Sequence, residues 1–242
     1  MRRFATLGRA AGLLADFRYE QSDPARFYGA LATDTATLTG HFADLDGAVV
    51  LDVGGGPGYF ADAFTRRGAD YLAVEPDPGE MHSGGLDVRG TVRAAGQHLP
   101  FADGSMDIAL SSNVVEHTPY PWQMADEMLR VTRPGGIVIV SYTLWWGPFG
   151  GHEMGLDHYL GGHRAARRYT NKHGHPPKNL YGTSLFAVTA AAGLRWATSR
   201  ADCADLVAAF PRYLPSWMWW VLRIPGLREV AATNLVLVLR PR

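Results

Sequence analysis

The sequence predicts a single α/β domain built on a mostly parallel β-sheet, and two observations carry this prediction. Apolar runs of strand length alternate with helix-like segments between residues 49 and 143. At the start of this series, the stretch VVLDVGGGPG, from Val49 to Gly58, reads as a buried strand that stops at a tight glycine loop, and a helix-like segment from Tyr59 to Arg67 follows at once. Such a loop suits a bound nucleotide, because glycine lets a ligand approach the main chain closely.

Length and composition fit one domain in the cytoplasm. The 242 residues can bury one core, and no Pro/Ser-rich or charged linker divides them. Basic and acidic residues number 23 each, so no overall charge draws the chain to nucleic acid. The single cysteine, Cys203, excludes internal disulfides. No apolar run approaches the ~20 residues that span a bilayer, and the N-terminus lacks a secretory pattern. We therefore expect a cytoplasmic protein without a nucleic-acid partner.

A helical cap is expected over residues 1–44, ahead of the first strand. Residues 1–20 have the pattern of a short basic amphipathic helix. A second helix should begin at Asp23 and Pro24, where a capping side chain precedes proline at the first helical position, and it should end at Gly40. Its apolar stripe includes Phe27, which we expect in the core, although this ring could also help to cover a bound cofactor.

The glycine loop and the strand after it are spaced for a nucleotide. Tyr71 to Glu75 reads as the next strand, and its final carboxylate stands 17 residues past Gly58. Because adjacent parallel strands end at the same edge of a sheet, Glu75 would accept hydrogen bonds from both ribose hydroxyls. These features suit NAD as well, since G-x-G-x-x-A also fits from Gly56 to Ala61. The loop has the spacing Asp-x-Gly-x-Gly-x-Gly, formed by Asp52, Gly54, Gly56 and Gly58.

The segment from Ala95 to His117 distinguishes NAD from the other nucleotide cofactors that the glycine loop and Glu75 would suit. Its sequence is AGQHLPFADGSMDIALSSNVVEH. The order of glycine loop, Glu75, LPFADGSMD and RPGG resembles the class I methyltransferases with a Rossmann-like fold, in particular their type 11 group, which use S-adenosylmethionine. The resemblance covers residues 45–143 firmly and the C-terminal third loosely. It implies a three-layer α/β fold with a seven-stranded, mostly parallel sheet and an antiparallel last strand.

The resemblance also implies a cofactor site at the ends of the first four strands. Asp52 would fix the glycine loop or contact the methionine end through water, and Glu75 would hold the ribose. Gln97 and His98 would lie near the adenine, and the tip of the fourth strand would face the transferred methyl group. The implied cofactor-binding residues are Asp52, Gly54, Gly56, Gly58, Glu75, Pro76, Gln97, His98 and Asn113.

Methyl transfer chiefly requires alignment of the acceptor and exclusion of water, because the leaving group of a sulfonium needs no proton. We expect the acceptor atom to be a hydroxyl oxygen of a small or lipid-linked molecule, for which histidine is the usual general base. His117, just after the fourth strand, is the first candidate, and holding its loop by a hydrogen bond is an equally open role. His152 and His158 are further candidates for the base.

Residues 144–182 depart from the alternating pattern and form an insertion after the fifth strand. At the carboxyl edge of the sheet, the insertion suits an acceptor pocket or a lid, with a surface excursion as the alternative. Its spacing of potential metal ligands matches no metal signature, so we predict no required metal. The potential ligands are His152, Glu153, Asp157 and His158.

Residues 183–242 should supply a helix at 184–192, a strand at 194–199 and a last strand at 234–240. Between these strands, the segment from Phe210 to Leu227 is dense in tryptophan and is flanked by Arg212, Arg223 and Arg228. It suits a pocket wall, a homodimer contact or peripheral contact with a membrane. Packing between the strands is the plain alternative.

The sequence therefore predicts a methyltransferase that uses S-adenosylmethionine and consists of one domain. Two other functions keep the same fold. An NAD(P)-dependent oxidoreductase is disfavoured by the LPFADGSMD segment, and a cofactor-binding protein without catalysis is disfavoured by the intact glycine loop and the polar tip of the fourth strand.

Overall fold

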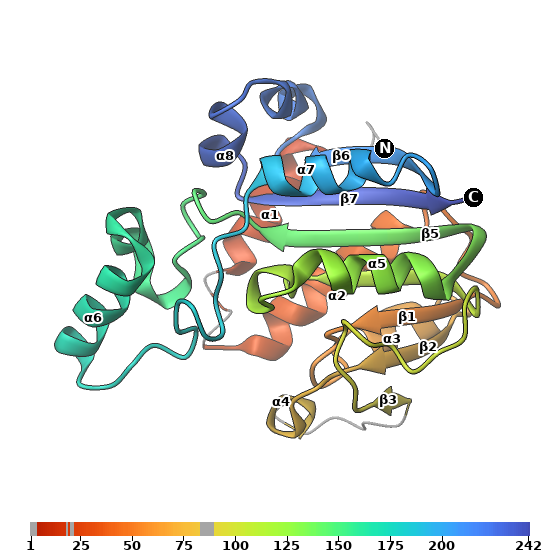
Figure 1. Cartoon of the computed structure of the whole chain (residues 1–242), viewed down its shortest axis with the longest axis horizontal. Coiled ribbons are helices and arrows are strands. Elements are labelled where there is room, and N and C mark those ends of the chain that lie inside the picture. The colour runs from red at the N-terminus through yellow and green to blue at the C-terminus, as the bar shows by residue number, and fades with distance from the viewer. Residues whose placement is uncertain (1–3, 18, 20–21, 83–89) are drawn as a thin grey trace.

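The computed structural model describes residues 4–17, 19, 22–82 and 90–242, and its centre is a seven-stranded sheet (Figure 1). The strands lie in the order β3-β2-β1-β4-β5-β7-β6, and the first five of these are mutually parallel, whereas β7 is antiparallel to both β5 and β6. This arrangement confirms the predicted sheet with its antiparallel last strand. The strands are β1 (Val49–Val53), β2 (Asp70–Val74), β3 (Thr91–Val92), β4 (Met106–Ser112), β5 (Thr132–Thr143), β6 (Ala204–Pro211) and β7 (Asn234–Pro241).

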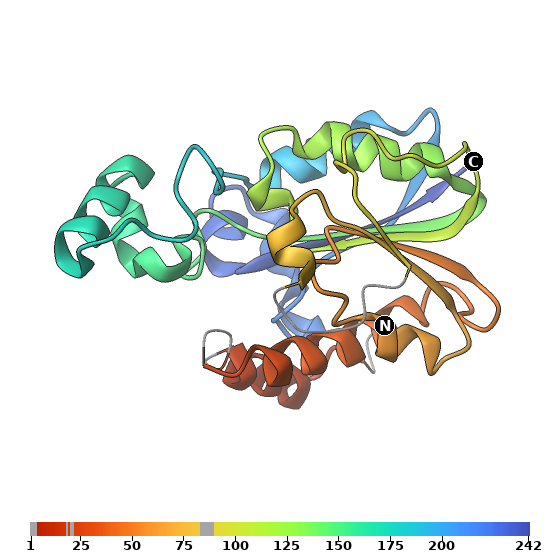
Figure 2. The same cartoon turned by 90° about the horizontal axis from the view of Figure 1, so that it is seen from below.

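Helices cover both faces of the sheet and complete three layers (Figure 2). One layer contains α5 (Pro121–Val131) and α7 (Ala190–Ser199), and the other contains α1 (Leu7–Phe17), α2 (Pro24–Thr39) and α3 (Ala61–Thr65). The central strands β1 and β4 are apolar and almost wholly buried, as expected for parallel strands with helices on both sides. Within the described residues, none of the helices has the length and apolar character needed to cross a bilayer.

The N-terminal cap follows its sequence signals. The side chain of Asp23 accepts a hydrogen bond from the backbone N–H of Arg26, so the start of α2 is capped as predicted. Phe27 is 2% exposed and packs in the core, as expected. The predicted helix over residues 1–20 corresponds to α1, and residues 1–3, 18 and 20 lie outside the described residues.

The C-terminal elements correct two predictions. Residues 184–189 are not helical, and the predicted strand at 194–199 is the second half of α7, which begins at Ala190 behind an N-cap on Thr189. Gly193 reads as a helix stop in the sequence, but it lies inside α7. Glycine is needed there because a Cβ would come within 2.0 Å of the Tyr142 hydroxyl oxygen. This glycine therefore permits close packing between α7 and β5.

The insertion lies beyond the end of β5 (Figure 1) and contains η2 (His152–Leu160), a 3₁₀ segment, and α6 (Gly162–His173). It has a small core, formed by Trp145, Met154 and Ala165 of the insertion together with Leu185, which follows it. Lys178, near its end, forms an ion pair of 3.0 Å with Glu80. Because Glu80 belongs to α4 (Pro78–His82), the helix after β2, this pair joins segments that follow two separate strands.

The aromatic-rich segment forms η3 (Ser216–Arg223) and precedes α8 (Leu227–Ala231) (Figure 1). Trp219 stacks on Phe210 of β6, with ring centroids 4.6 Å apart, so this ring packs against the sheet. Trp217 and Trp220 remain 68% and 49% exposed. One part of the segment therefore packs against the sheet, and another part forms an exposed aromatic surface.

Arg212 is fully buried at the end of β6, which contradicts its expected place on the flank of a membrane interface. Its guanidinium donates to the carboxylate of Asp34 at 2.8 Å and to the hydroxyl of Thr35 at 2.7 Å, both on α2. Arg9 of α1 donates to the same carboxylate and to the carbonyl of Arg212 at 2.9 Å. The ion pairs therefore hold the N-terminal cap to the end of β6.

We expect Arg212→Ala to lower the free energy of unfolding by about 3 kcal/mol, because it leaves Asp34 buried with only one of its two cations. Urea denaturation followed by circular dichroism would measure the change. Arg66→Ala is the control, since Arg66 pairs with Asp62 on the exposed surface and its loss should hardly matter. Equal stability of the two variants would show that Arg9 alone satisfies Asp34.

Candidate functional site

The glycine loop lies at the carboxyl end of β1 and leaves room for a ligand. The N–H groups of Gly54 and Gly55 donate to the carbonyl of Val74 at 2.8 and 3.2 Å, which ties the loop to β2. Gly54 must be glycine, because its φ is 83° and a Cβ would come within 2.4 Å of Val114. Gly56 and Gly58 also have positive φ, but the space where their Cβ atoms would lie is open. The loop can therefore accept a ligand against its backbone.

Glu75 lies directly beside this loop, as the sequence predicted. One carboxylate oxygen accepts a hydrogen bond from the Gly56 N–H at 3.2 Å, and the other accepts one from the Asp77 N–H at 3.0 Å. Burial raises the pKa of this carboxyl, which is only 9% exposed. Pro76, the next residue, is exposed. The two contacts fix the acid at the place where the ribose of a nucleotide would lie.

Asp52 lies under the loop rather than on it. Its carboxylate accepts a hydrogen bond of 2.6 Å from the hydroxyl of Tyr71, a residue of β2. Burial raises the pKa of Asp52 to about 7, against the opposing effect of that hydroxyl, and nearby Glu75 adds to the rise. The contact joins β1 to β2 next to the loop, and the role of Asp52 in fixing the loop stays a prediction.

Gln97 and His98 belong to the loop after β3. The amide of Gln97 donates to the hydroxyl of Thr118, which joins this loop to the segment after β4. Gly96 allows the loop to pack closely, because a Cβ there would come within 2.7 Å of Met124 on α5. The side chain of His98 is exposed. The structure therefore brings Gln97 to the end of β4 and leaves His98 at the surface.

Asn113 is fixed at the tip of β4 by contacts with two further strands. Its φ of 58° is unusual for a residue other than glycine. The backbone N–H donates to the carbonyl of Ser141 on β5 at 2.8 Å, and the side-chain oxygen accepts from the amide of Asn234 on β7 at 2.8 Å. Asn234 also accepts from the hydroxyl of Ser141 at 2.9 Å. The sequence did not predict Asn234 as a site residue. The feature that could have indicated it is a polar residue at the start of an otherwise apolar strand.

Two of the three predicted histidines meet after β4. The rings of His117 and His152 are nearly perpendicular, with centroids 5.0 Å apart. His117 belongs to η1 (Val115–His117), and its Nδ1 lies 2.7 Å from the carbonyl of Ser184. Burial lowers the pKa of His152, and the neighbouring His117 lowers it further. The neutral form of the His152 imidazole is therefore favoured.

His158 lies in a different environment and does not fit the predicted role of general base. It is completely buried, with its Nδ1 2.7 Å from the carbonyl of Gly155 and its ring against Trp145 and Tyr159. An acceptor would find no exposed surface of this imidazole. The hydrophobic core of the insertion explains the burial, which spacing in the sequence could not reveal.

The four residues that were weighed as metal ligands do not act together. The carboxylate of Glu153 accepts from the backbone N–H of Asn179 at 2.6 Å and from its side-chain amide at 2.9 Å. Asp157 pairs with Arg168 at 3.1 Å. These contacts, with the burial of His158, give Glu153, Asp157 and His158 separate structural roles.

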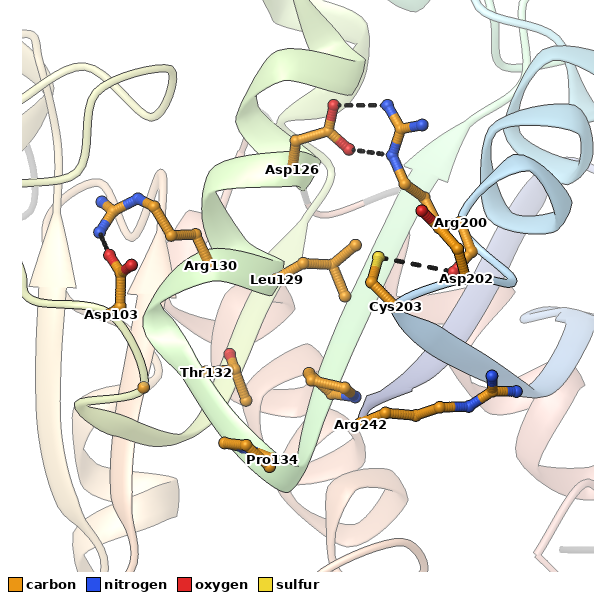
Figure 3. A pocket seen from close by; sticks show the side chains of 12 residues that line it. Asp103, Asp126, Leu129, Arg130, Thr132, Pro134, Arg200, Asp202, Cys203 and Arg242 are labelled. Atoms are coloured by element: carbon orange, nitrogen blue, oxygen red, sulfur yellow. Dashed lines mark hydrogen bonds and ion pairs between the residues drawn. The ribbon is translucent and has the colours of Figure 1, made fainter.

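A hollow of about 690 Å³ lies at the other end of the strands from the glycine loop (Figure 3). It is lined by residues at the start of β5, such as Thr132 and Pro134, and by ion pairs such as Asp126 with Arg200. Since parallel sheets bind ligands at the carboxyl ends of their strands, this hollow is not the candidate site.

Comparison with known proteins identifies the family. A family model described as a methyltransferase domain matches residues 51–140. An uncharacterized methyltransferase of Mycobacterium sp. (strain KMS) is 62% identical, over 99% of this chain and 97% of its own length. Another from Mycobacterium marinum is 61% identical over the same shares. The chain belongs to the class I methyltransferases. It uses S-adenosylmethionine as its co-substrate, which excludes the alternative of an NAD(P)-dependent oxidoreductase.

Solved structures agree with this methyltransferase in fold. An S-adenosylmethionine-dependent methyltransferase from Mesorhizobium loti matches with a TM-score of 0.57 and 17% identity, covering 86% of this chain and 97% of that one. A geranyl diphosphate methyltransferase in complex with S-adenosylmethionine matches with a TM-score of 0.52 and 15% identity, covering 89% and 90% of the two chains. At such identities the likeness shows the fold alone.

The residues at the carboxyl edge fit S-adenosylmethionine. The open backbone at Gly56 and Gly58 suits its methionine part, and the buried carboxylate of Glu75 suits its ribose hydroxyls. Bound there, the co-substrate supplies a methyl group on a sulfonium, whose departure as a thioether needs no proton.

Glu75→Ala should weaken binding of S-adenosylhomocysteine at least about tenfold, since it removes the predicted acceptor for two ribose hydroxyls. Isothermal titration calorimetry would measure the dissociation constant, and circular dichroism would report the fold. Glu80→Ala, which removes a half-exposed carboxylate from the next helix, serves as the control. Unchanged affinity in Glu75→Ala would remove this residue from the site.

Asp52 should make stability depend on pH. Its carboxyl loses a proton near 3.8 in the unfolded chain and near 7 in the folded protein, so the folded protein binds the extra proton between these values. The contribution of Asp52 to the free energy of unfolding is therefore greatest below pH 3.8. It falls as the pH rises from there to about 7, and it stays constant above about pH 7. Between about pH 5 and pH 8, the loss should be of the order of 2 kcal/mol.

The variant Asp52→Asn should not show this loss, because asparagine stays neutral and can still accept the Tyr71 hydroxyl. Differential scanning calorimetry at the two pH values would compare the variant with the wild type, and Asp62→Asn, at an exposed position, gives the control. If Asp52→Asn lost as much stability as the wild type on going to the higher pH, another group would cause the dependence.

Proposed function

We propose that this methyltransferase transfers the methyl group to a hydroxyl oxygen of a small or lipid-linked acceptor. The observation that carries the proposal is the pair formed by His117, which follows β4, and His152, which follows β5, at the same edge as the glycine loop and Asn113. Histidine is the side chain that most readily exchanges a proton near neutral pH, and a hydroxyl acceptor has a proton to lose.

The arrangement at His117 suits a general base. Its Nδ1 is engaged by the carbonyl of Ser184, so this nitrogen carries the ring proton and Nε2 is the basic atom. The acceptor oxygen attacks the methyl carbon while Nε2 takes the hydroxyl proton. The bond between carbon and sulfur breaks, and its electron pair remains on sulfur, which gives a methyl ether and S-adenosylhomocysteine.

The exposed aromatic surface supports an acceptor with a lipid part. Trp217, Trp220 and Ile224 are at least 44% exposed, and Leu7 of α1 is 64% exposed. These elements are close in space, because the Ser216 N–H donates to the carbonyl of Ala5 at 2.9 Å. Such a surface suits shallow contact with a membrane, from which a lipid-linked acceptor would be taken.

Incubation of cell extracts with the enzyme and an isotopically labelled methyl donor would test the acceptor class. The aqueous and lipid fractions would be compared by mass spectrometry, and the label should appear as a methyl ether. Label on nitrogen or carbon would contradict the proposal and would identify the true acceptor atom.

With that acceptor, His117→Ala should lower kcat by about 100-fold, the usual contribution of a general base, and should leave affinity for S-adenosylhomocysteine nearly unchanged. His163→Ala, on α6, is the matched control. Normal turnover in His117→Ala would show that the base lies elsewhere or is unnecessary.

A further inference from the structure

Glu116 has an unsatisfied carboxylate oxygen deep in the protein. The residue is 1% exposed, and Oε1 accepts a hydrogen bond of 3.0 Å from the backbone N–H of Thr143 at the end of β5. Oε2 is also buried, and none of the described residues donates a hydrogen bond to it. A buried carboxylate oxygen without a partner is costly, so the structure calls for a cation or another donor at this place.

The two histidines of the site supply suitable neighbours. Glu116, His117 and His152 each offer one potential ligand atom, and the three atoms all lie within 4.8 Å of one another. The groups come from two distant parts of the chain, the segment after β4 and the start of η2 in the insertion. Their spacing in the sequence therefore gave no metal signature.

Outer contacts already orient two of the three side chains. The Thr143 N–H holds one oxygen of Glu116 and leaves the other available. The carbonyl of Ser184 engages Nδ1 of His117, which leaves Nε2 with a free lone pair. Metal-binding carboxylates and histidines in proteins usually have such partners, because these contacts fix the ligand atom and its tautomer.

The backbone brings His152 to this place at some cost. Its φ of 49° lies in the left-handed region, which residues other than glycine seldom adopt. The preceding loop is folded tightly, since a Cβ on Gly150 would lie 2.1 Å from the carbonyl oxygen of Trp145. Strain of this kind collects at functional sites.

We propose that Glu116, His117 and His152 bind a divalent transition-metal cation. Two imidazoles and one carboxylate form a ligand set that suits Zn²⁺ and leaves a fourth position open. Ligand atoms about 2.1 Å from a tetrahedral ion are roughly 3.4 Å apart, so the separations of up to 4.8 Å would have to shorten by at most roughly 1.4 Å to close the site. His152 can make this adjustment, because its Nδ1 lies 3.5 Å from the carbonyl of Gly150, which is a weak contact.

The metal site stands independently of the proposed hydroxyl methylation, but it would change one part of that reaction. With the cation in place, His117 and His152 act as ligands rather than as proton acceptors. Bound there, the cation would supply Lewis acidity to an acceptor hydroxyl, and the hydroxyl proton would pass to solvent water. This also revises the expectation from the sequence that the enzyme needs no metal.

The test measures metal binding alone, without methyl donor or acceptor. Untagged protein, freed of metal with a chelator and dialysed, would be titrated with Zn²⁺ by calorimetry. We expect one equivalent to bind, and we expect Glu116→Gln and His152→Ala each to weaken binding at least about tenfold. His41→Ala is the control, because it removes an exposed histidine just after α2 that is not one of the three proposed ligands.

Binding of S-adenosylhomocysteine would show that each variant is folded, and Co²⁺ absorption spectra would report the ligand geometry in the wild type. Equal Zn²⁺ affinity in the wild type and in a folded Glu116→Gln or His152→Ala variant would overturn the proposal, as would binding only at millimolar concentrations. Because no acceptor is used, such a result would leave hydroxyl methylation standing. Failure to find a hydroxyl acceptor would likewise leave a measured metal site standing.

Discussion

The parallel pairing of β1 with β2 on one side and β4 on the other places the functional groups. Asp52 is opposite Ala73 of β2 and Leu110 of β4, so the three strands end together. The glycine loop, Glu75 and Asn113 follow these ends and meet at one edge, although they are far apart in the chain. A shift of one residue in either pairing would move the side chains of a strand to the other face of the sheet, against the wrong helices, so packing on both faces also fixes the register that forms the site.

Two polar networks attach the outer parts of the molecule to this sheet. Arg212, paired with Asp34, holds the helical cap against the end of β6. Asn234 connects the tip of β7 to Asn113 and Ser141 at the candidate site. Because buried polar groups need specific partners, these contacts define one arrangement of cap, sheet and site, whereas apolar packing alone would tolerate several.

Local patterns in the sequence predicted the fold and the cofactor edge, because strands, the glycine loop and an acid at a strand end are set by neighbouring residues. Properties that depend on distant contacts could not be predicted. Gly193 reads as a helix stop, but Tyr142 makes it a packing residue inside α7. Arg212 reads as a surface charge until Asp34 is seen beside it. The approach of His152 to Glu116 depends on a strained backbone that no spacing reveals.

The ion pair of Lys178 with Glu80 spans the edge of the sheet. Glu80 follows β2 and Lys178 follows β5, and β1 and β4 lie between these two strands. Both side chains are well exposed, so the pair contributes at most about 1 kcal/mol. Thermal motion can therefore break this bridge frequently, and salt weakens it further. Exchange of spent for fresh co-substrate across this edge thus meets no large barrier from the bridge.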